Sequence, residues 1–340
     1  MRRIALRKTG WDEPLALEAL GEPPTPKGHE VLVEVEACGV CHRDLLDREG
    51  RFPFLRPGVT PGHEVCGRVI ALGDRVTDWR VGDRVGTMHR DSCGVCGACL
   101  DGQTSLCESA AFVLGILADG GYASHLVVPE RGLFALPDGL PAASAAILHC
   151  TFGTAYRDLA VLGGLKAGER VLVTGANGGV GLAAVQVAAR LGATVVAAVR
   201  SAEHEPALRA LGAAEVVVGA GDAIHKHPRT GRIDLALDTV GEPTFGAALR
   251  TLRVGGRIVV VGNVTPAKVA LKLGYVITFG LTIRGGSGAT RADMAALLAL
   301  HAERRFDIAV QAWPLADADR AQRAVKSGGL HGRIALDPNR

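Results

Sequence analysis

Four cysteines in the stretch CGVCGACLDGQTSLC, residues 93 to 107, follow the spacing C-x2-C-x2-C-x7-C. Four thiolates on one glycine-rich loop can close a tetrahedral shell around a zinc ion. An iron–sulfur cluster also takes four cysteines, and four free thiols are the plainer alternative. Closed four-thiolate sites are typical of structural zinc, so we predict a zinc ion that holds this loop and performs no chemistry. Its ligands are Cys93, Cys96, Cys99 and Cys107.

Two earlier stretches also contain residue types that bind metals. CGVCHRDLLD, residues 38 to 47, has two cysteines, a histidine and an aspartate, and PGHEVCGRVIALG, residues 61 to 73, has a histidine followed by a glutamate. On spacing alone, a single histidine is more often a loop residue with satisfied hydrogen bonds than a ligand. These two stretches by themselves therefore leave a second metal site open.

A glycine-rich loop, GANGGVG at residues 175 to 181, follows the strand-like RVLVT and precedes a small apolar helix. In that context the backbone amides at the start of the helix can hold a pyrophosphate. Ala176 occupies one glycine position of the fingerprint G-x-G-x-x-G, and a structural turn is the alternative. We predict dinucleotide binding by Gly175, Ala176, Asn177, Gly178, Gly179, Val180 and Gly181.

The end of the next strand indicates which dinucleotide is bound. TVVAAV is followed by Arg200 and Ser201, where an NAD enzyme would usually present a carboxylate to the ribose. A guanidinium suits a 2′-phosphate, and a hydroxyl stands beside it. We therefore expect NADP(H) in preference to NAD(H), with a solvated arginine at a loop tip as the alternative. Further cofactor contacts are expected at Val240, Gly262 and Asn263.

The elements that must position these residues fall into two groups. Up to about residue 136 the chain shows short strands, such as Val31 to Val35 with its period of two, and similar segments at 65–70 and 122–128. Beyond residue 150, strands and helices alternate, which predicts a buried parallel sheet. The expected strands are 170–174, 194–199, 215–218, 233–238 and 257–262, and the expected helices include 203–211 and 243–252. The fold class is α/β: a β-rich domain, then a doubly wound domain, with the last 50 or so residues returning to the first.

Length and composition agree with two ordinary globular domains. The chain has 340 residues, 48% of them hydrophobic, and a mixed net charge of +3, which is too mild for a nucleic-acid footprint. The first ten residues lack the apolar core of a secretory signal, and no stretch is suited to spanning a membrane. Without a secretory signal, clustered cysteines favour thiolate ligands over disulfides. We expect a cytoplasmic protein with neither a membrane nor a nucleic-acid partner.

Four motifs occur together and in one order: CGVCH, GHE-x2-G-x5-G, the four-cysteine loop and the glycine loop. This combination resembles the zinc-dependent medium-chain dehydrogenase/reductase superfamily, the alcohol dehydrogenase group, over nearly the whole chain. The resemblance implies a GroES-like catalytic domain of residues 1–149 and 286–340 and a Rossmann dinucleotide-binding domain of residues 150–285. It also implies an active site in the cleft between the two domains.

The same resemblance implies a second, catalytic zinc. Its ligands would be Cys41, His63 and Cys150, the last within HCTFGTAY. Three protein ligands leave a fourth position for water or substrate. His149, next to Cys150, remains an alternative ligand.

Several neighbours of these ligands receive roles from the resemblance. Glu64 would lie beside the metal or bind it transiently, and Asp44 would orient the metal-binding histidine. His42 matches a position that contacts the cofactor phosphate. Cys38 is expected to be a small buried residue, and Cys66 has no assigned role.

Arg43 departs from the pattern of the alcohol dehydrogenases, which carry Ser or Thr two residues after the ligand cysteine. That hydroxyl passes the alcohol proton outward, whereas a guanidinium has no acceptor. Either another group relays the proton or the substrate needs a cation. A third alternative is that Arg43 turns away and pairs with Asp44 or Asp47.

A closer resemblance bears on this departure. CHRDLL, TGANGGVGLAAVQVA, DTVGEPTFGAALRTLRVGGRIVVVGNV and LKLGYV resemble the archaeal acryloyl-CoA reductase branch of the superfamily, which carries arginine at this position. That branch reduces a carbon–carbon double bond conjugated to a thioester with NADPH.

Three functions are compatible with these motifs. The leading one is a zinc-dependent NADP(H) oxidoreductase acting on a small alcohol or carbonyl compound, in which zinc polarises the oxygen and the nicotinamide delivers hydride. The alternative is an NADPH enoyl reductase acting on an acryloyl-CoA or enone substrate. A non-catalytic zinc- and nucleotide-binding protein is disfavoured, since the full set of catalytic ligands is present. The resemblance also implies a homodimer or homotetramer joined through the Rossmann sheet edge, near Leu281 to Arg284.

Overall fold

The protein, seen in a computed structural model that describes residues 1–109, 112–328 and 332–340, divides into two compact units. Unit 1 consists of Met1–Cys150 and Ile308–Arg340, and unit 2 of Thr151–Asp307. Within the described residues, none of the helices has both the length and the apolar character needed to span a membrane.

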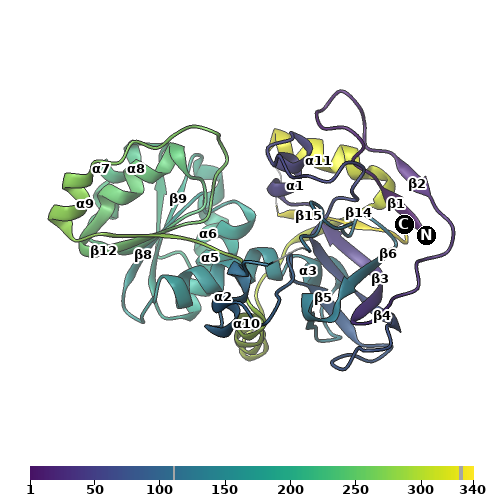
Figure 1. The fold of residues 1–340 in the computed structure, drawn as a ribbon. Helices are drawn as coiled ribbons and strands as arrows, with labels where there is room; N and C mark the ends of the chain where they lie inside the picture. Colours follow the sequence, from purple (N-terminus) through teal and green to yellow (C-terminus); the bar gives the residue numbers. More distant parts are fainter. Residues whose placement is uncertain (110–111, 329–331) are drawn as a thin grey trace. The chain divides into compact units, whose positions relative to one another are not determined.

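Unit 1 is built around a seven-stranded sheet in the order β14-β15-β3-β4-β5-β7, with β6 also paired to β3 (Figure 1). The strands of unit 1, including two outside this sheet, are β1 (Arg2–Ile4), β2 (Leu17–Ala19), β3 (Glu30–Gly39), β4 (Glu64–Leu72), β5 (Arg84–Thr87), β6 (His125–Pro129), β7 (Leu133–Ala135), β14 (Val310–Pro314) and β15 (Arg333–Asp337). Its helices are α1 (His42–Arg48), α2 (Gly97–Leu100), α3 (Ala142–Ala146) and α11 (Ala318–Ser327).

The long strand β3 organises the core of unit 1, because it pairs with β4, β6 and β15. Val31, Val33 and Val35 are fully buried and Glu34 is exposed, but Leu32 is also buried, so the period of two read from the sequence holds only from residue 33 to residue 35. Cys38, near the end of β3, is fully buried in the same core, as expected. Cys41 lies just after β3 and His63 just before β4, and these strands pair antiparallel with Gly39 opposite Glu64, which places both residues at one end of this sheet.

Unit 2 is a six-stranded parallel sheet in the order β10-β9-β8-β11-β12-β13. Its strands are β8 (Arg170–Thr174), β9 (Thr194–Val199), β10 (Glu215–Val218), β11 (Ile233–Asp238), β12 (Leu252–Val260) and β13 (Thr282–Gly285). Its helices are α4 (Thr154–Tyr156), α5 (Gly179–Arg190), α6 (Glu205–Ala210), α7 (Ala223–Lys226), α8 (Glu242–Thr251), α9 (Leu273–Phe279) and α10 (Arg291–Glu303).

The strand order of unit 2 reverses at β8, because the chain first moves outward through β9 and β10 and then returns to β11 on the other side. Right-handed crossovers in the two directions place α5 and α6 on one face and α8 and α9 on the other (Figure 1). The sequence prediction of a doubly wound sheet is confirmed. The carboxyl ends of β8 and β11 meet at the reversal point, where a ligand of such a sheet binds.

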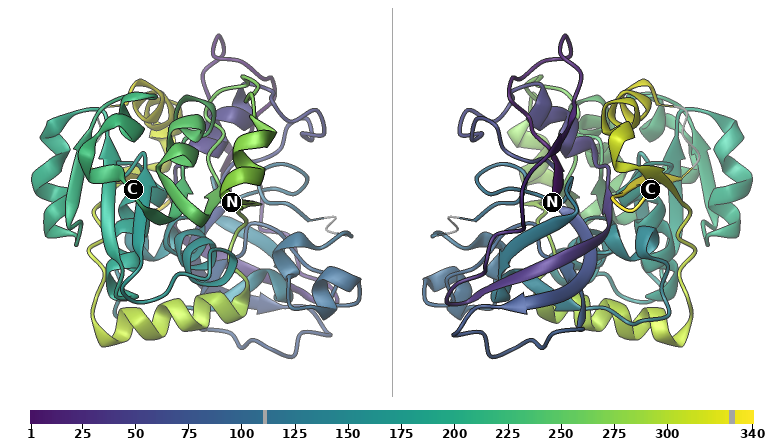
Figure 2. Two further views of the ribbon diagram at one scale, coloured as in Figure 1. Left: turned by 90° about the vertical axis from the view of Figure 1, so that its left-hand side faces the viewer. Right: turned by 90° about the vertical axis from the view of Figure 1, so that its right-hand side faces the viewer.

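The unit boundary differs from the one expected near residue 286. Helix α10, drawn in yellow-green in Figure 2, belongs to unit 2. The Arg157 guanidinium, 2% exposed, pairs with Asp293 of this helix at 2.7 Å. Gln186 of α5 accepts a hydrogen bond from the Asp307 amide at 2.8 Å and donates one to its carbonyl. These contacts join residues more than 100 positions apart, and only from residue 308 does the chain return to unit 1.

Candidate metal and nucleotide sites

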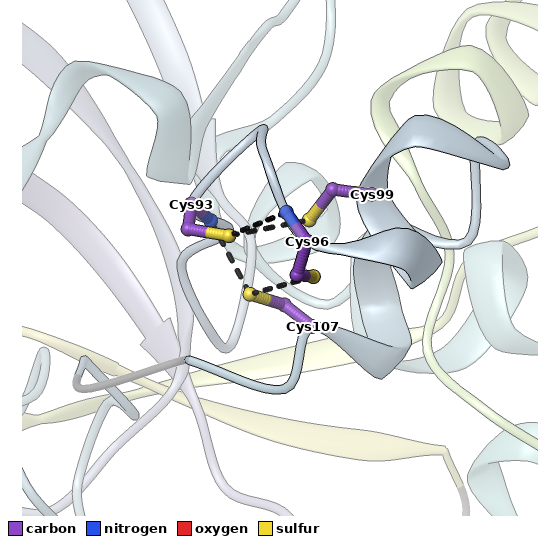
Figure 3. A group of neighbouring side chains, drawn as sticks. All are labelled: Cys93, Cys96, Cys99 and Cys107. Atoms are coloured by element: carbon purple, nitrogen blue, oxygen red, sulfur yellow. Dashed lines mark hydrogen bonds between the residues drawn. The ribbon is translucent and has the colours of Figure 1, made fainter.

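The four cysteines of the loop converge as Figure 3 shows, with their sulfur atoms all within 4.8 Å of one another. Two Sγ–Sγ distances, Cys93 to Cys99 and Cys96 to Cys107, are 4.0 Å. Zinc bound tetrahedrally at about 2.3 Å from each sulfur would separate the sulfurs by about 3.8 Å. The amides of Val95 and Cys96 donate to Cys93 Sγ and lower the pKa of this thiol to about 6. The loop therefore fits a zinc ion, with the ligands already in place.

A second cluster brings together Cys41, His63, Glu64 and Cys150, whose candidate ligand atoms also lie within 4.8 Å of one another. The Cys41 and Cys150 sulfurs are 3.8 Å apart, and Cys150 Sγ lies 3.5 Å from His63 Nε2. A tetrahedral zinc would require about 3.8 Å and about 3.6 Å for these two separations. All four residues belong to unit 1, and the three expected ligands fit zinc.

The alternative ligand His149 is not part of this cluster. It is buried, and its ring lies 5.2 Å from that of His89 and 6.1 Å from that of Phe134. Its neighbour Cys150 is the residue that meets the other two ligands.

Asp44 fixes the orientation of the histidine ligand. Its Oδ1 atom accepts a hydrogen bond from His63 Nδ1 at 3.1 Å, which leaves Nε2 free to bind a metal. Its Oδ2 atom accepts the Cys41 amide at 2.8 Å and so holds the first turn of α1. Burial and the Arg43 charge lower the pKa of His63, but Asp44 and Cys41 outweigh them and raise it to about 10.

Glu64 is held by an arginine that sequence reasoning missed. Arg333, the first residue of β15, donates to both carboxylate oxygens of Glu64, at 2.8 and 2.6 Å. Glu64 is fully buried, and its burial raises the pKa of the carboxyl although Arg333 opposes this. The two residues are 269 positions apart, so no short sequence motif contains both of them and indicates the pair.

Arg43 extends from the first turn of α1 and is held on two sides. Its Nη2 atom donates to the Leu114 carbonyl oxygen at 2.6 Å and lies 3.4 Å from Asp47 Oδ2. Of the two acidic neighbours considered, Asp47 is therefore the partner, while Asp44 serves the histidine. Burial raises the pKa of Asp47 to about 7, with the Arg43 charge opposing.

The glycine loop of unit 2 requires its glycines where it turns. Gly175 directly follows β8 with φ of +56°, in the left-handed region. A Cβ on Gly181 would lie 2.2 Å from the Gly175 carbonyl oxygen, so only glycine lets α5 approach the loop. The Ala176 amide donates to the Ala198 carbonyl at 3.2 Å, which ties the loop to the end of β9.

The remaining nucleotide candidates of unit 2 follow the ends of neighbouring strands. Exposed Arg200 and half-buried Ser201 come directly after β9. A Cβ on Gly262 would lie 2.0 Å from the Thr239 carbonyl carbon, so the segment after β12 passes close beside the one after β11. The Val264 amide donates to the Val240 carbonyl at 3.1 Å, and Asn263 lies between these contacts. His42, the other nucleotide candidate, is exposed at the start of α1 in unit 1.

Comparison with known proteins identifies the class. Residues 27–138 match the alcohol dehydrogenase GroES-like domain, and residues 179–303 match the zinc-binding dehydrogenase domain. An acryloyl-coenzyme A reductase of Sulfurisphaera tokodaii is 34% identical over 317 residues, 93% of this chain and 94% of the relative. An alcohol dehydrogenase of Geobacillus stearothermophilus is 34% identical over 332 residues, 96% and 97% of the two chains. The crystal structure of AibC is similar with a TM-score of 0.92 and 38% identity, covering 99% of this chain and 95% of that one.

The chain therefore belongs to the zinc-binding medium-chain dehydrogenase/reductase family, with a GroES-like domain and a Rossmann domain. It is an alcohol dehydrogenase-like oxidoreductase. The family and the fold class predicted from the sequence are both confirmed.

Proposed function

We propose that the protein transfers a hydride between NADP(H) and a small alcohol or carbonyl substrate at a zinc ion held by Cys41, His63 and Cys150. The observation that carries this proposal is the set of sulfur–sulfur and sulfur–nitrogen distances, 3.8 and 3.5 Å, which suit one tetrahedral ion. Both oxygens of Glu64, the fourth group of the cluster, are bonded by Arg333. The zinc would thus keep a position for the substrate oxygen.

The residues of unit 1 have distinct tasks in this proposal. The zinc ion, when bound, polarises the substrate oxygen, and the nicotinamide, when bound, gives or takes the hydride. Asp44 holds the imidazole of His63 in the tautomer that presents Nε2. Arg333 keeps the Glu64 carboxylate paired, which prevents an unbalanced negative charge beside two thiolates. The proton of the alcohol does not pass through Arg43, because a guanidinium cannot accept it.

The phosphorylated cofactor is proposed on the basis of Arg200. This exposed cation directly follows β9, where the ribose of a dinucleotide lies in a sheet of this type. Its charge would pair with a 2′-phosphate. The loop from Gly175 to Gly181 would hold the pyrophosphate.

A second candidate function is the reduction of a double bond conjugated to a thioester or ketone. Arg43 supports it only in part, since it stands where a hydroxyl would serve an alcohol dehydrogenase. Its guanidinium already bonds the Leu114 carbonyl and lies 3.4 Å from Asp47, so a substrate anion would compete with Asp47 for this charge. The similarity to relatives named acryloyl-coenzyme A reductase points in the same direction. In that reaction the hydride goes to the β-carbon and a proton to the α-carbon.

We also propose a homo-oligomer and a cytoplasmic location. All four residues of the edge strand β13 are exposed, and this strand pairs only with β12 among the described strands of its sheet. Leu273 and Ile277 of the neighbouring α9 are 65% and 78% exposed, so a second copy could cover this edge. Six of the eight cysteines are needed as thiolates by the two metal sites, which suits a reducing compartment.

The experiment that tests the function is an NADPH-oxidation assay against a panel of aldehydes, ketones, enones and acryloyl-CoA, with NADH in parallel. The proposal expects turnover of aldehydes or ketones and the reverse reaction with the matching alcohol. Turnover confined to the conjugated compounds would establish the second candidate instead. In that case Arg43→Thr should raise KM for the thioester by about tenfold, the loss of one charge-assisted contact.

A further inference from the structure

A row of polar side chains crosses the core of unit 1. Asp44, Tyr122, Gln322 and Arg48 are each no more than 1% exposed, in a region otherwise filled by aliphatic residues. Burying polar and charged groups is unfavourable unless they bond to one another. Buried polar side chains that bond to one another make the surrounding core rigid, so their contacts show which groups they hold in place.

The contacts fall into two groups, and one of them ends at the metal site. The Tyr122 hydroxyl donates to Asp44 Oδ2 at 3.1 Å. The Gln322 side chain of α11 accepts a hydrogen bond from Arg48 Nη1 at 3.3 Å, and its Nε2 atom has no hydrogen-bond partner among the described residues. Arg48 is itself fixed by Asp319 Oδ1 at 2.6 Å and by the Gly10 and Glu13 carbonyls.

The Asp44 carboxylate is the common acceptor of three hydrogen bonds. The donors are the Cys41 amide, the Tyr122 hydroxyl and His63 Nδ1. Each of these three donors comes from a different part of unit 1: the start of α1, the segment before β6 and the segment before β4. The carboxylate is thereby held from three sides, and its remaining freedom is small. A carboxylate fixed in this way also fixes the imidazole that donates to it.

Tyr122 is held by close packing of its ring as well as by the hydrogen bond of its hydroxyl. A Cβ on Gly62 would lie 2.4 Å from the Tyr122 ring, so the residue just before His63 must be glycine to admit the ring. The Tyr122 amide and carbonyl bond the backbone of Pro61 and Ile4. Removing the hydroxyl alone therefore leaves the ring in place and tests the hydrogen bond separately from the packing.

We propose that Tyr122 is a positioning residue for the candidate ligand His63, acting through Asp44. Its hydroxyl holds the carboxylate that holds the imidazole, and so it sets how rigidly Nε2 is presented to the metal. This inference rests on the metal site of the proposed function, but it is independent of which substrate is used.

The test is the release of zinc from the holoprotein carrying Tyr122→Phe. A coloured chelator captures the released zinc, and one of the two ions should be released about tenfold faster than from the unmodified protein. This factor is the low end of the loss of metal affinity that follows removal of a group bonded to a metal ligand. The ion of the four-cysteine loop should be released at the unmodified rate. In cobalt-substituted protein, the visible absorption of the cysteine–histidine site should shift. The matched control is Tyr275→Phe, whose ring packs on Phe279 in unit 2, 4.4 Å away.

Unchanged zinc release and an unchanged cobalt spectrum in Tyr122→Phe would overturn the inference while leaving the proposed function intact. A single zinc ion in the unmodified protein would overturn the inference and the metal site together.

Discussion

Arg333 is the residue whose removal should disturb unit 1 most specifically. Arg333→Met keeps an unbranched apolar side chain in place of the arginine stem but leaves Glu64 without its cation. Glu64 is fully buried, and both of its oxygens accept from Arg333 at 2.6 and 2.8 Å. The perturbation therefore creates an uncompensated buried carboxylate beside the two cysteines of the metal site.

The size of the effect follows from this burial. Removing one partner of a buried ion pair typically costs about 3–5 kcal/mol. Part of that is recovered because Glu64 can take up a proton, its pKa already being raised by burial. We expect a loss of about 3 kcal/mol in the free energy of unfolding at pH 8, and a smaller loss as the pH falls and the carboxyl becomes neutral.

Tryptophan fluorescence in a urea titration measures this loss, because Trp11, Trp79 and Trp313, the three tryptophans of the chain, all belong to unit 1. The matched control is Arg68→Met on β4. Its side chain is 44% exposed where it pairs with Glu36 at 3.1 Å, so less than about 1 kcal/mol should be lost.

The double variant Glu64→Met with Arg333→Met removes both charges and should regain most of the stability. Equal losses for Arg333→Met and Arg68→Met would refute the reasoning. So would a double variant as unstable as the single one.

Three further predictions concern other parts of the molecule. Cys96→Ser should remove one of two zinc ions and lower the melting temperature, because a closed metal site contributes to folding; elemental analysis and calorimetry check this, and an unchanged melting temperature would count against it. Arg200→Asp should weaken NADPH by about 2 kcal/mol, roughly thirtyfold in KM, and leave NADH unaffected; equal kcat/KM for both cofactors in the unmodified enzyme would contradict the assignment. Burial raises the pKa of Asp158 from 3.8 to about 7, so the folded state holds this proton more tightly and the stabilising contribution disappears as pH rises from about 4 to about 7. Asp158→Asn should therefore raise the melting temperature above that of the unmodified protein by more at pH 8 than at pH 5. The same pH dependence of the melting temperature in both proteins would disprove this.

The strands of the Rossmann sheet were predictable because their signal is local. Strands 170–174, 194–199, 215–218 and 233–238 coincide with β8 to β11, since each is a short apolar run between turn residues. The strand expected at 122–128 instead spans His125–Pro129. Tyr122 lies outside it because its ring is used against Gly62 and its hydroxyl against Asp44.

The candidate metal-binding residues could be singled out only through their combination with other motifs, since one cysteine or histidine by itself carries little information. No sequence motif indicated a structural role for Arg333 or Gln322. Each is a single polar residue on an ordinary strand or helix, and its partner, Glu64 or Arg48, is more than 250 positions away. The extent of unit 2 was missed for the same reason, because the buried pair of Arg157 and Asp293 is formed only when the chain has folded.

The most direct test of the account is the activity and zinc content of Cys41→Ser, measured on the same sample. The account predicts one zinc ion per chain in place of two, an unchanged four-cysteine site, and NADPH-dependent reduction slower by at least about a thousandfold, since the ion that polarises the substrate is lost. Retention of most of the activity by a protein that has lost this zinc would contradict the claim that Cys41, His63 and Cys150 hold the reacting metal.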